Sequence, residues 1–234
     1  MHRNLKKKIL ILGGSSSIAR ELVNNINKET YEIFLHYNQN KPNLEKKNIK
    51  FIKKDFKKLN QKNMKIMTKN FKNFDIIINL LGYIDNKSYF KSNYENLIKS
   101  LNVNFFAPLF IVQKSLNYMK KNKFGRIINC SSIGTKFGGG TNTFNYSLSK
   151  HCSEFIPKEL RNLSSKNVLF NNIKIGVINT KIHKKILNKN ISKRIKLIPA
   201  KRMGKSSEIV KLILFLINEN SYIASETINI SGGE

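Results

Sequence analysis

The feature that most constrains the fold is the alternation of short apolar runs with segments of helical periodicity along the whole chain. Such alternation is typical of βαβ units, in which helices connect parallel strands and cover the sheet. The pattern therefore predicts an α/β fold, a single doubly wound domain with a seven-stranded parallel sheet. The predicted strands are Lys8–Leu12, Glu32–His36, Ile49–Lys53, Asp75–Asn79, Arg126–Cys130, Val168–Lys174 and Thr227–Ile230, and the predicted helices are Ser17–Asn27, Leu59–Asn70, Tyr94–Lys121, Asn145–Leu163 and Ser206–Asn218.

The length of 234 residues fits one sheet-centred domain, which is expected to cover residues 1–234. The N-terminal residues run into the first apolar segment without the apolar core of a secretory signal. No apolar run approaches the ~18 residues of a membrane span, so a cytoplasmic protein is expected. Cys130 and Cys152 are isolated, and neither a disulfide framework nor a metal site is indicated.

The chain is strongly basic, with 43 Lys and Arg against 14 Asp and Glu and a formal net charge of +29. A basic surface favours polyanions such as nucleic acid, because bound cations release counterions from phosphates. The lysines are nevertheless spread along the chain and accompany frequent Asn and Ile, which AT-rich codon usage also produces. No helix-turn-helix pattern or basic and aromatic stacking platform supports a specific nucleic-acid partner.

A turn of small residues, Gly13 to Ala19, follows the first predicted strand. A helix that begins at such a turn presents free N–H groups and the positive end of its dipole, and both favour a pyrophosphate. Gly13 and Gly14 allow unusual backbone angles, and the hydroxyls of Ser15–Ser17 can donate hydrogen bonds. Similar turns precede helices that bind nothing, so the motif alone leaves both interpretations open.

The residues after the second predicted strand bear on the choice of nicotinamide cofactor. A carboxylate at this point binds the ribose 2′-OH of NAD and repels the 2′-phosphate of NADP. The segment His36 to Lys41 has no acid, while Asn38 and Lys41 suit a 2′-phosphate. NADP(H) is therefore favoured, with NAD(H) left open. Asp55, after the third strand, fits either a hydrogen bond to the adenine amino group or a helix N-cap.

Ser132, Tyr146 and Lys150 form the strongest chemical pattern. Tyr146 and Lys150 are four residues apart in a predicted helix and so lie on one face. An ammonium stabilises a phenolate and lowers the tyrosine pKa, which brings proton transfer within reach at neutral pH. Ser132 follows the fifth strand and can hold a substrate oxygen while hydride arrives from a nicotinamide. A Tyr-x-x-x-Lys pair also occurs on ordinary solvated helices, but the strand-end serines and the glycine-rich turn favour catalysis.

With these motifs in place, the chain resembles the short-chain dehydrogenase/reductase family over essentially its full length. The glycine-rich turn, Tyr146 with Lys150, and Ser132 at 14 residues before Tyr146 carry the resemblance. Asn104 lies at the position of the family's helix asparagine. Further similar segments are Asn79–Gly82, Asn129–Ser132, Ile175–Thr180, Arg202–Glu208 and Ser231–Gly233.

The resemblance implies a Rossmann domain with the strand order 3-2-1-4-5-6-7, no metal, and a homodimer or homotetramer. It implies that the catalytic residues are Asn104, Ser132, Tyr146 and Lys150, that Lys150 also binds the nicotinamide ribose, and that Asn104 helps to hold a proton-relay water. The implied cofactor-binding residues are Gly13, Ser15, Ser16, Ser17, Ile18, Asn38, Asp55, Asn79, Gly82, Tyr146, Lys150, Gly176, Ile178 and Thr180.

The chain departs from the family pattern at three positions. Ser17 and Ala19 replace glycines, and Ile175 replaces a proline, which is expected to weaken cofactor binding. The predicted protein is an NAD(P)(H)-dependent oxidoreductase that reduces a carbonyl or oxidises an alcohol, and its substrate can be a 3-oxoacyl carrier, a sugar or a pteridine. A non-catalytic dinucleotide sensor is the alternative, and a nucleic-acid-binding protein is a weaker one.

The segment Thr180–Ile198 is basic and corresponds to the loop that closes over the substrate in the family. If this charge is functional, the substrate is expected to be anionic, either a small metabolite or one borne by an acidic carrier protein. Codon usage explains the same residues without such a role. The seven basic residues are Lys181, Lys184, Lys185, Lys189, Lys193, Arg194 and Lys196.

Overall fold

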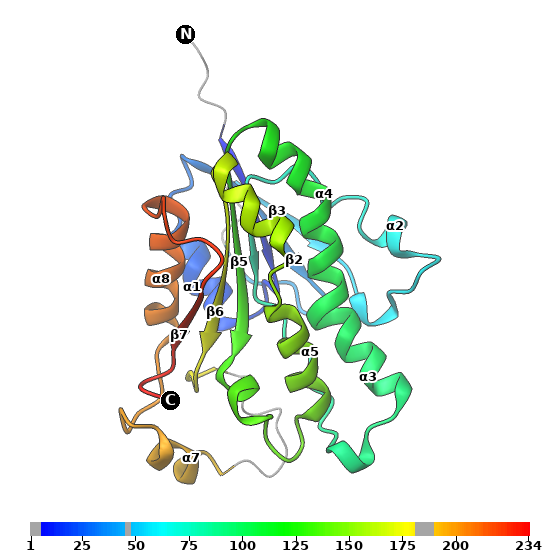
Figure 1. The fold of residues 1–234 in the computed structure, drawn as a ribbon, viewed down its shortest axis with the longest axis vertical. Coiled ribbons are helices and arrows are strands. Elements are labelled where there is room, and N and C mark those ends of the chain that lie inside the picture. The colour runs from blue at the N-terminus through cyan, green and yellow to red at the C-terminus, as the bar shows by residue number, and fades with distance from the viewer. Residues whose placement is uncertain (1–5, 45–47, 181–189) are drawn as a thin grey trace.

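The computed structural model describes residues 6–44, 48–180 and 190–234, which form one parallel sheet covered by helices on both faces (Figure 1). The strand order is β3-β2-β1-β4-β5-β6-β7, so the predicted α/β class, strand count and strand order are confirmed. The strands are β1 (Lys7–Leu12), β2 (Tyr31–Tyr37), β3 (Ile49–Lys53), β4 (Ile76–Asn79), β5 (Gly125–Ser132), β6 (Val168–Ile175) and β7 (Thr227–Ile230).

The central strands are apolar on both faces because both faces are covered. Ile9 and Ile11 of β1 pack toward one hydrophobic cluster, and Leu10 and Leu12 pack toward another. Helices α1 (Ser17–Asn25) and α8 (Ser206–Asn218) supply the first cluster. Helix α4 (Ala107–Lys121) supplies much of the second, and α3 (Tyr94–Leu101) and α5 (Phe144–Glu154) lie on the same side of the sheet (Figure 1). Buried parallel strands of this kind read as continuous apolar runs in the sequence.

Two predicted helices are shorter than expected. The region Leu59–Asn70 contains only α2 (Met64–Met67), because reciprocal hydrogen bonds between Asn60 and Asn63 form a turn there. The predicted helix Asn145–Leu163 divides after Glu154, because Pro157 cannot continue the helical hydrogen bonds. The second part is α6 (Lys158–Asn162).

The long predicted helix Tyr94–Lys121 is continuous but changes its hydrogen-bond pattern in the middle. Helices α3 and α4 are joined by a π-helical segment, Asn102–Phe106, in which Ala107 N–H donates to the Asn102 carbonyl. An additional helix, α7 (Ile191–Leu197), lies in a segment where no helix was predicted. Short 3-10 helices cover Phe56–Lys58, Tyr89–Lys91, Ile133–Phe137 and Leu163–Lys166.

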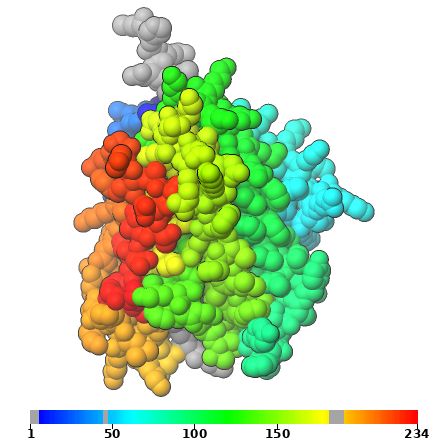
Figure 2. Space-filling model, in the orientation of Figure 1, coloured from blue at the N-terminus to red at the C-terminus, as the bar shows by residue number. Residues whose placement is uncertain are grey.

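The space-filling view shows one contact between segments that are far apart in the sequence (Figure 2). In the space-filling view, the C-terminal segment (red) lies directly against the region of α5 and α6 (yellow-green) (Figure 2). Within the residues that the structure describes, no helix combines the length and apolar character needed to cross a membrane.

Candidate active site

A cleft of about 1630 Å³ opens where the parallel strands end. This is the edge of an open α/β sheet at which ligands bind. The cleft brings together the glycine-rich turn, the end of β5, the start of α5 and the segment after β6. Of the predicted site residues, its lining includes Gly13, Ser15, Ser16, Ser17, Ile18, Asn38, Gly82, Ser132, Tyr146, Lys150, Gly176, Ile178 and Thr180, whereas Asp55, Asn79 and Asn104 lie outside the lining.

Glycine is required at both positions that begin the turn. Gly13 has a φ of +83°, and a Cβ atom there would lie 2.7 Å from the Leu80 carbonyl oxygen. A Cβ atom on Gly14 would lie 2.5 Å from the Leu35 side chain and 2.8 Å from the His36 carbonyl oxygen. The turn therefore passes so close to β2 and β4 that no side chain fits, which leaves its outer side open to the cleft.

Two serines of the turn make hydrogen bonds within the protein that stabilise the turn. Ser16 caps α1, because its hydroxyl oxygen accepts the Ala19 N–H at 3.1 Å. The Ser15 hydroxyl donates to the Asn40 carbonyl at 2.7 Å. The first turn of α1 has no acidic residue, so nothing there opposes an anion at the helix N-terminus. Ser15 therefore already uses its hydroxyl hydrogen within the protein, and its contact with a cofactor stays a prediction.

His36 supports the turn from the end of β2, a role that no sequence motif indicated. Its Nδ1 accepts the Gly13 N–H at 3.3 Å, and its Nε2 lies 3.0 Å from the Lys54 carbonyl oxygen. Because a carbonyl oxygen only accepts hydrogen bonds, Nε2 must carry the ring hydrogen, and Nδ1 must be unprotonated. The ring stacks on Phe56 at 4.7 Å, and burial lowers the pKa of His36 to about 4. His36 is thus a neutral, oriented acceptor.

The cleft continues past the end of β2, where a cofactor's adenosine end is expected. Asn38 and Lys41 both line it, and Lys41 Nζ lies 4.8 Å from the centre of the Phe51 ring. Asp55 accepts the Lys57 N–H at 3.1 Å and caps the 3-10 helix that follows β3. The helix-cap role expected as one alternative for Asp55 is therefore present, while its contact with adenine stays a prediction.

Ser132 and Tyr146 face each other from β5 and α5. Burial raises the pKa of Tyr146 to about 12, and a hydrogen bond with the Ser132 side chain acts in the opposite direction. The expected lowering of the Tyr146 pKa is therefore absent in this structure, where the effect of burial is the largest. The physical reason is that desolvation of the phenolate outweighs the hydrogen bond with Ser132, although the Tyr146 side chain still lines the cleft.

Lys150 is 2% exposed and lies one helical turn beyond Tyr146. Its Nζ donates to the Leu81 carbonyl at 2.7 Å and to the Cys130 carbonyl at 2.6 Å. Burial lowers the pKa of Lys150 to about 8, against the opposite effects of Cys130 and Glu154. Burial also raises the pKa of the Cys130 thiol to about 12, so this thiol is neutral when Lys150 titrates. The lysine can therefore lose its proton close to neutral pH.

Asn104 lies in the π-helical segment and is fully buried. Its Oδ1 accepts the Tyr83 N–H at 2.8 Å, and its Nδ2 donates to the Tyr83 carbonyl at 3.0 Å and to Ser149 Oγ at 2.9 Å. The side chain thus ties the loop after β4 to α5, between Tyr146 and Lys150. Its part in holding a water stays a prediction. A π-helical segment here agrees with the frequent occurrence of such segments at functional sites.

The segment after β6 forms the far wall of the cleft. A Cβ atom on Gly176 would lie 2.6 Å from the Ser231 Cα, so only glycine lets this segment pass the C-terminal strand. Ile178 forms a β-bridge with Gly204, which holds the wall in place. Lys193 and Arg194 of α7 line the cleft, and Arg194 pairs with Glu234. Lys181, Lys184, Lys185 and Lys189 lie outside the described residues, and the anionic substrate stays a prediction.

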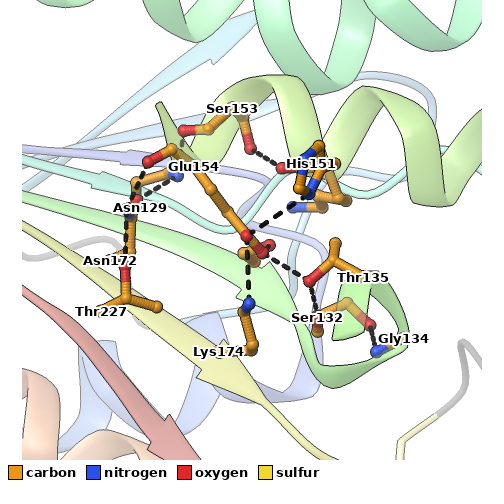
Figure 3. Close-up of polar contacts among 12 residues, drawn as sticks. Asn129, Ser132, Gly134, Thr135, His151, Ser153, Glu154, Asn172, Lys174 and Thr227 are labelled. Atoms are coloured by element: carbon orange, nitrogen blue, oxygen red, sulfur yellow. Dashed lines mark hydrogen bonds and ion pairs between the residues drawn. The ribbon is translucent and has the colours of Figure 1, made fainter. Parts of the chain in front are cut away.

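A ladder of asparagines crosses strands β4, β5 and β6, and it was not among the predicted features. Asn79 Nδ2 donates to Asn129 Oδ1, and Asn129 Nδ2 donates to Asn172 Oδ1, each at 2.8 Å. Asn129 and Asn172 also donate to the carbonyls of Ser153 and Glu154, the last residues of α5, at 2.8 Å (Figure 3). The ladder therefore fixes α5 on the sheet. The available signal was an Asn in each of these three strands.

Comparisons with known proteins agree with this geometry. A family model described as enoyl-(acyl carrier protein) reductase matches residues 13–234. The 3-oxoacyl-[acyl-carrier-protein] reductase FabG of Aquifex aeolicus (strain VF5) is 33% identical over 162 residues, which are 68% of this chain and 64% of that protein. FabG of Buchnera aphidicola subsp. Baizongia pistaciae is 34% identical over 161 residues, with coverages of 68% and 65%. The matched regions thus span slightly less than two thirds of these relatives.

Solved structures show the same fold over nearly the full chain. A 4-hydroxyisoleucine dehydrogenase complexed with NADH has a TM-score of 0.84 at 22% identity and covers 97% of this chain and 98% of its own. A 3-oxoacyl (acyl-carrier-protein) reductase from Agrobacterium tumefaciens C58 with NADP bound has a TM-score of 0.81 at 20% identity, with coverages of 97% and 94%.

Proposed function

Because this chain belongs to the short-chain dehydrogenase/reductase family, we propose that it is an NADPH-dependent reductase of 3-oxoacyl thioesters. The observation that carries the proposal is the meeting of Ser132, Tyr146 and Lys150 in one cleft with the glycine-rich turn. The similarity to 3-oxoacyl-[acyl-carrier-protein] reductases supports the substrate class.

The cleft fits a nicotinamide dinucleotide on the residues present. Gly13 lines the cleft just before α1, and the N-terminus of this helix is uncompensated by an acid. Asn38 and Lys41 would hold a 2′-phosphate, and Arg20 also lines this part of the cleft. When bound, NADPH supplies a hydride to the carbonyl carbon of the substrate.

The side chains on β5 and α5 bind the substrate carbonyl oxygen and protonate it. Ser132 donates a hydrogen bond to the carbonyl oxygen and holds it next to Tyr146. The Tyr146 hydroxyl gives its proton to this oxygen as negative charge develops there. A raised pKa suits this role, because the phenol stays protonated until the oxygen becomes strongly basic. The Lys150 ammonium stabilises the phenolate that is left.

Two hydroxyls directed at a single oxygen favour reduction of a 3-oxo group over reduction of a carbon–carbon double bond. In the 3-oxo reaction the oxygen itself becomes an alcohol and takes up the proton, which Tyr146 can supply directly. In enoyl reduction the added hydrogens finish on carbon. The family description and the relatives' names thus suggest different reactions, and the arrangement of Ser132 and Tyr146 supports the 3-oxo reaction.

The experiment is a comparison of acetoacetyl and crotonyl thioesters with the purified chain and NADPH, followed by the loss of NADPH absorbance. We expect turnover with the acetoacetyl thioester and identification of the 3-hydroxy thioester as its product. Turnover of the crotonyl thioester alone would replace the proposal with enoyl reduction. Tight NADPH binding without turnover of either thioester would support a dinucleotide sensor instead.

A further inference from the structure

Glu154, the last residue of α5, lies in a polar network beside the turn that carries Ser132 (Figure 3). Its Oε1 accepts the Ser131 hydroxyl at 2.5 Å and the Thr135 hydroxyl at 2.7 Å. Ser131 precedes Ser132 in β5, and Thr135 lies in the 3-10 helix that follows it. One carboxylate oxygen therefore holds both sides of the turn that carries Ser132.

The other carboxylate oxygen of Glu154 lies near two basic side chains. Lys174 Nζ of β6 lies 3.1 Å from Oε2, and His151 Nδ1 lies 3.9 Å from it. The Glu154 side chain is only 13% exposed, so these contacts compensate a largely buried charge. Glu154 thus connects α5, β5 and β6 through a single carboxyl group.

Glu154 also follows Lys150 by one turn on α5. Four charged or titratable groups surround Lys150 and Glu154: Cys130 of β5, Tyr146 and His151 of α5, and Lys174 of β6. Burial raises the pKa values of Cys130 and Tyr146 to about 12, so both are neutral near neutral pH. Glu154 is therefore the anion that acts on Lys150 there, and it raises the pKa of Lys150 against the effect of burial.

We propose that Glu154 is a positioning residue of this active site, whose carboxylate holds the Ser132 turn against α5 and whose charge acts on Lys150 one helical turn away. A role limited to packing would not require a carboxylate at this position. The hydroxyls of Ser131 and Thr135 need an acceptor, whereas the charge acts on Lys150 through space. The proposal rests on the proposed function for the consequence to catalysis, but the effect on Lys150 is a property of the protein alone.

The test measures the titration of Lys150 directly. Lysine is labelled with ¹³C at Cε, and the Lys150 signal is assigned by its loss in Lys150→Met. Glu154→Gln removes the charge and keeps the side-chain shape, and we expect the Lys150 midpoint to fall by about one pH unit, the size of a nearby charge's effect in a partly buried site. Lys174→Met removes the counter-charge, and the midpoint should rise. Glu159→Gln, an exposed acid on α6, is the matched control and should leave it unchanged.

The Lys150 midpoint is expected to fall in Glu154→Gln and to rise in Lys174→Met, and a simple loss of structure would not produce these opposite shifts. If Glu154→Gln does not fold, as judged by its thermal melt, Lys174→Met still decides: an unchanged or lower midpoint overturns the proposal. An unchanged midpoint in folded Glu154→Gln overturns it as well. With acetoacetyl thioester, kcat/KM of Glu154→Gln near pH 8 should fall about fivefold, because a fall of the Lys150 midpoint from about 8 to about 7 lowers its protonated fraction from about one half to about one tenth. The Kd for NADPH should stay within about twofold. If the wild type does not turn over this thioester, the proposed function fails. The Lys150 titration still tests the effect of Glu154, because it does not depend on turnover.

Discussion

Nδ1 of His36 accepts the backbone N–H of Gly13 at 3.3 Å, which joins the glycine-rich turn to a buried imidazole at the end of β2. The acceptor exists only while the ring is neutral, because both nitrogens of a protonated histidine donate. Burial is the largest influence on this ring and lowers its pKa to about 4, although the Lys54 carbonyl and Asp55 act in the opposite direction. The shape of the turn is therefore coupled to the proton on His36.

This coupling predicts a loss of stability in mild acid. The pKa of His36 is about 4 in the folded chain and 6.5 in the unfolded chain, so the unfolded chain binds a proton more readily between these values. Stability is fully present above pH 6.5 and declines as the pH falls toward 4. Urea unfolding should show that the wild type loses about 2 kcal/mol more than His36→Asn between pH 7 and about pH 4.5. Equal losses in both proteins would show that His36 is not the responsible group.

Replacement of Tyr146 by Phe should remove at least about 99% of turnover, as is typical when a proton donor is lost. The Kd for NADPH should stay within about twofold, because the lost hydroxyl serves the reacting oxygen. Tyr222→Phe is the matched control, since Tyr222 is 95% exposed and outside the cleft lining. Substantial activity in Tyr146→Phe would mean that another group supplies the proton.

The pH dependence of kcat/KM should reflect Lys150. Burial lowers its pKa to about 8, so the ammonium is present below pH 8 and is lost as the pH rises through this value. Tyr146, with its pKa raised to about 12, stays protonated throughout this range. For carbonyl reduction, kcat/KM should therefore fall as the pH rises above about 8. Lys150→Met should be less active at every pH and should lack this decline. A profile that stays level up to pH 10 would contradict the assignment.

NADPH should bind more tightly than NADH, because the end of β2 offers Asn38 and Lys41 and no carboxylate. Asn38→Asp should reverse the order, since a carboxylate accepts the ribose 2′-OH and repels a 2′-phosphate. Fluorescence titrations with both cofactors measure the two dissociation constants. Asn43→Asp, at a position that also lines the cleft, tests whether any added charge has the same effect. Tighter binding of NADH by the wild type would refute the preference.

Two glycines with positive φ should respond differently to alanine. Gly138 has a φ of +69°, and a Cβ atom added there would meet no other atom within 4 Å, so Gly138→Ala should cost only the backbone strain, about 1–2 kcal/mol. Gly13→Ala adds a clash with the backbone of Leu80, which cannot rotate away. We expect a larger decrease in the melting temperature and the loss of NADPH binding for Gly13→Ala alone. Similar melting temperatures for the two variants would contradict this explanation.

The central strands were predictable because a strand buried on both faces leaves a dense apolar run. Strands β3 and β7 include exposed residues, and all seven predicted strands are present. Helix interruptions were harder to predict. The end of α5 at Glu154 depends on Pro157, which the sequence shows, but apolar periodicity continues beyond it. The π-helical segment Asn102–Phe106 arises from a shift in hydrogen bonding that hardly alters the apolar pattern, so it could not be predicted.

At the site, local motifs were predictable and long-range contacts were not. Ser132, Tyr146 and Lys150 meet as their spacing suggested, although their roles stay predictions. The pKa of Tyr146 was not predictable, because it depends on how deeply the ring is enclosed. The contacts of His36 with Gly13 and of Glu154 with Ser131 join residues 23 positions apart in each case, and no local pattern announces them.

The asparagine ladder has a consequence for how the sheet assembles. Asn79, Asn129 and Asn172 are direct neighbours in the pairing of β4 with β5 and of β5 with β6. If one of these strands slipped by a single residue, its asparagine would point to the opposite face and leave buried amides without partners. Each unpaired group costs about 1–3 kcal/mol, whereas the many isoleucines of these strands could pack in either alignment with little loss. The three amides therefore select one alignment of otherwise interchangeable apolar strands during folding, and the same selection brings the β5 and α5 residues of the cleft into line.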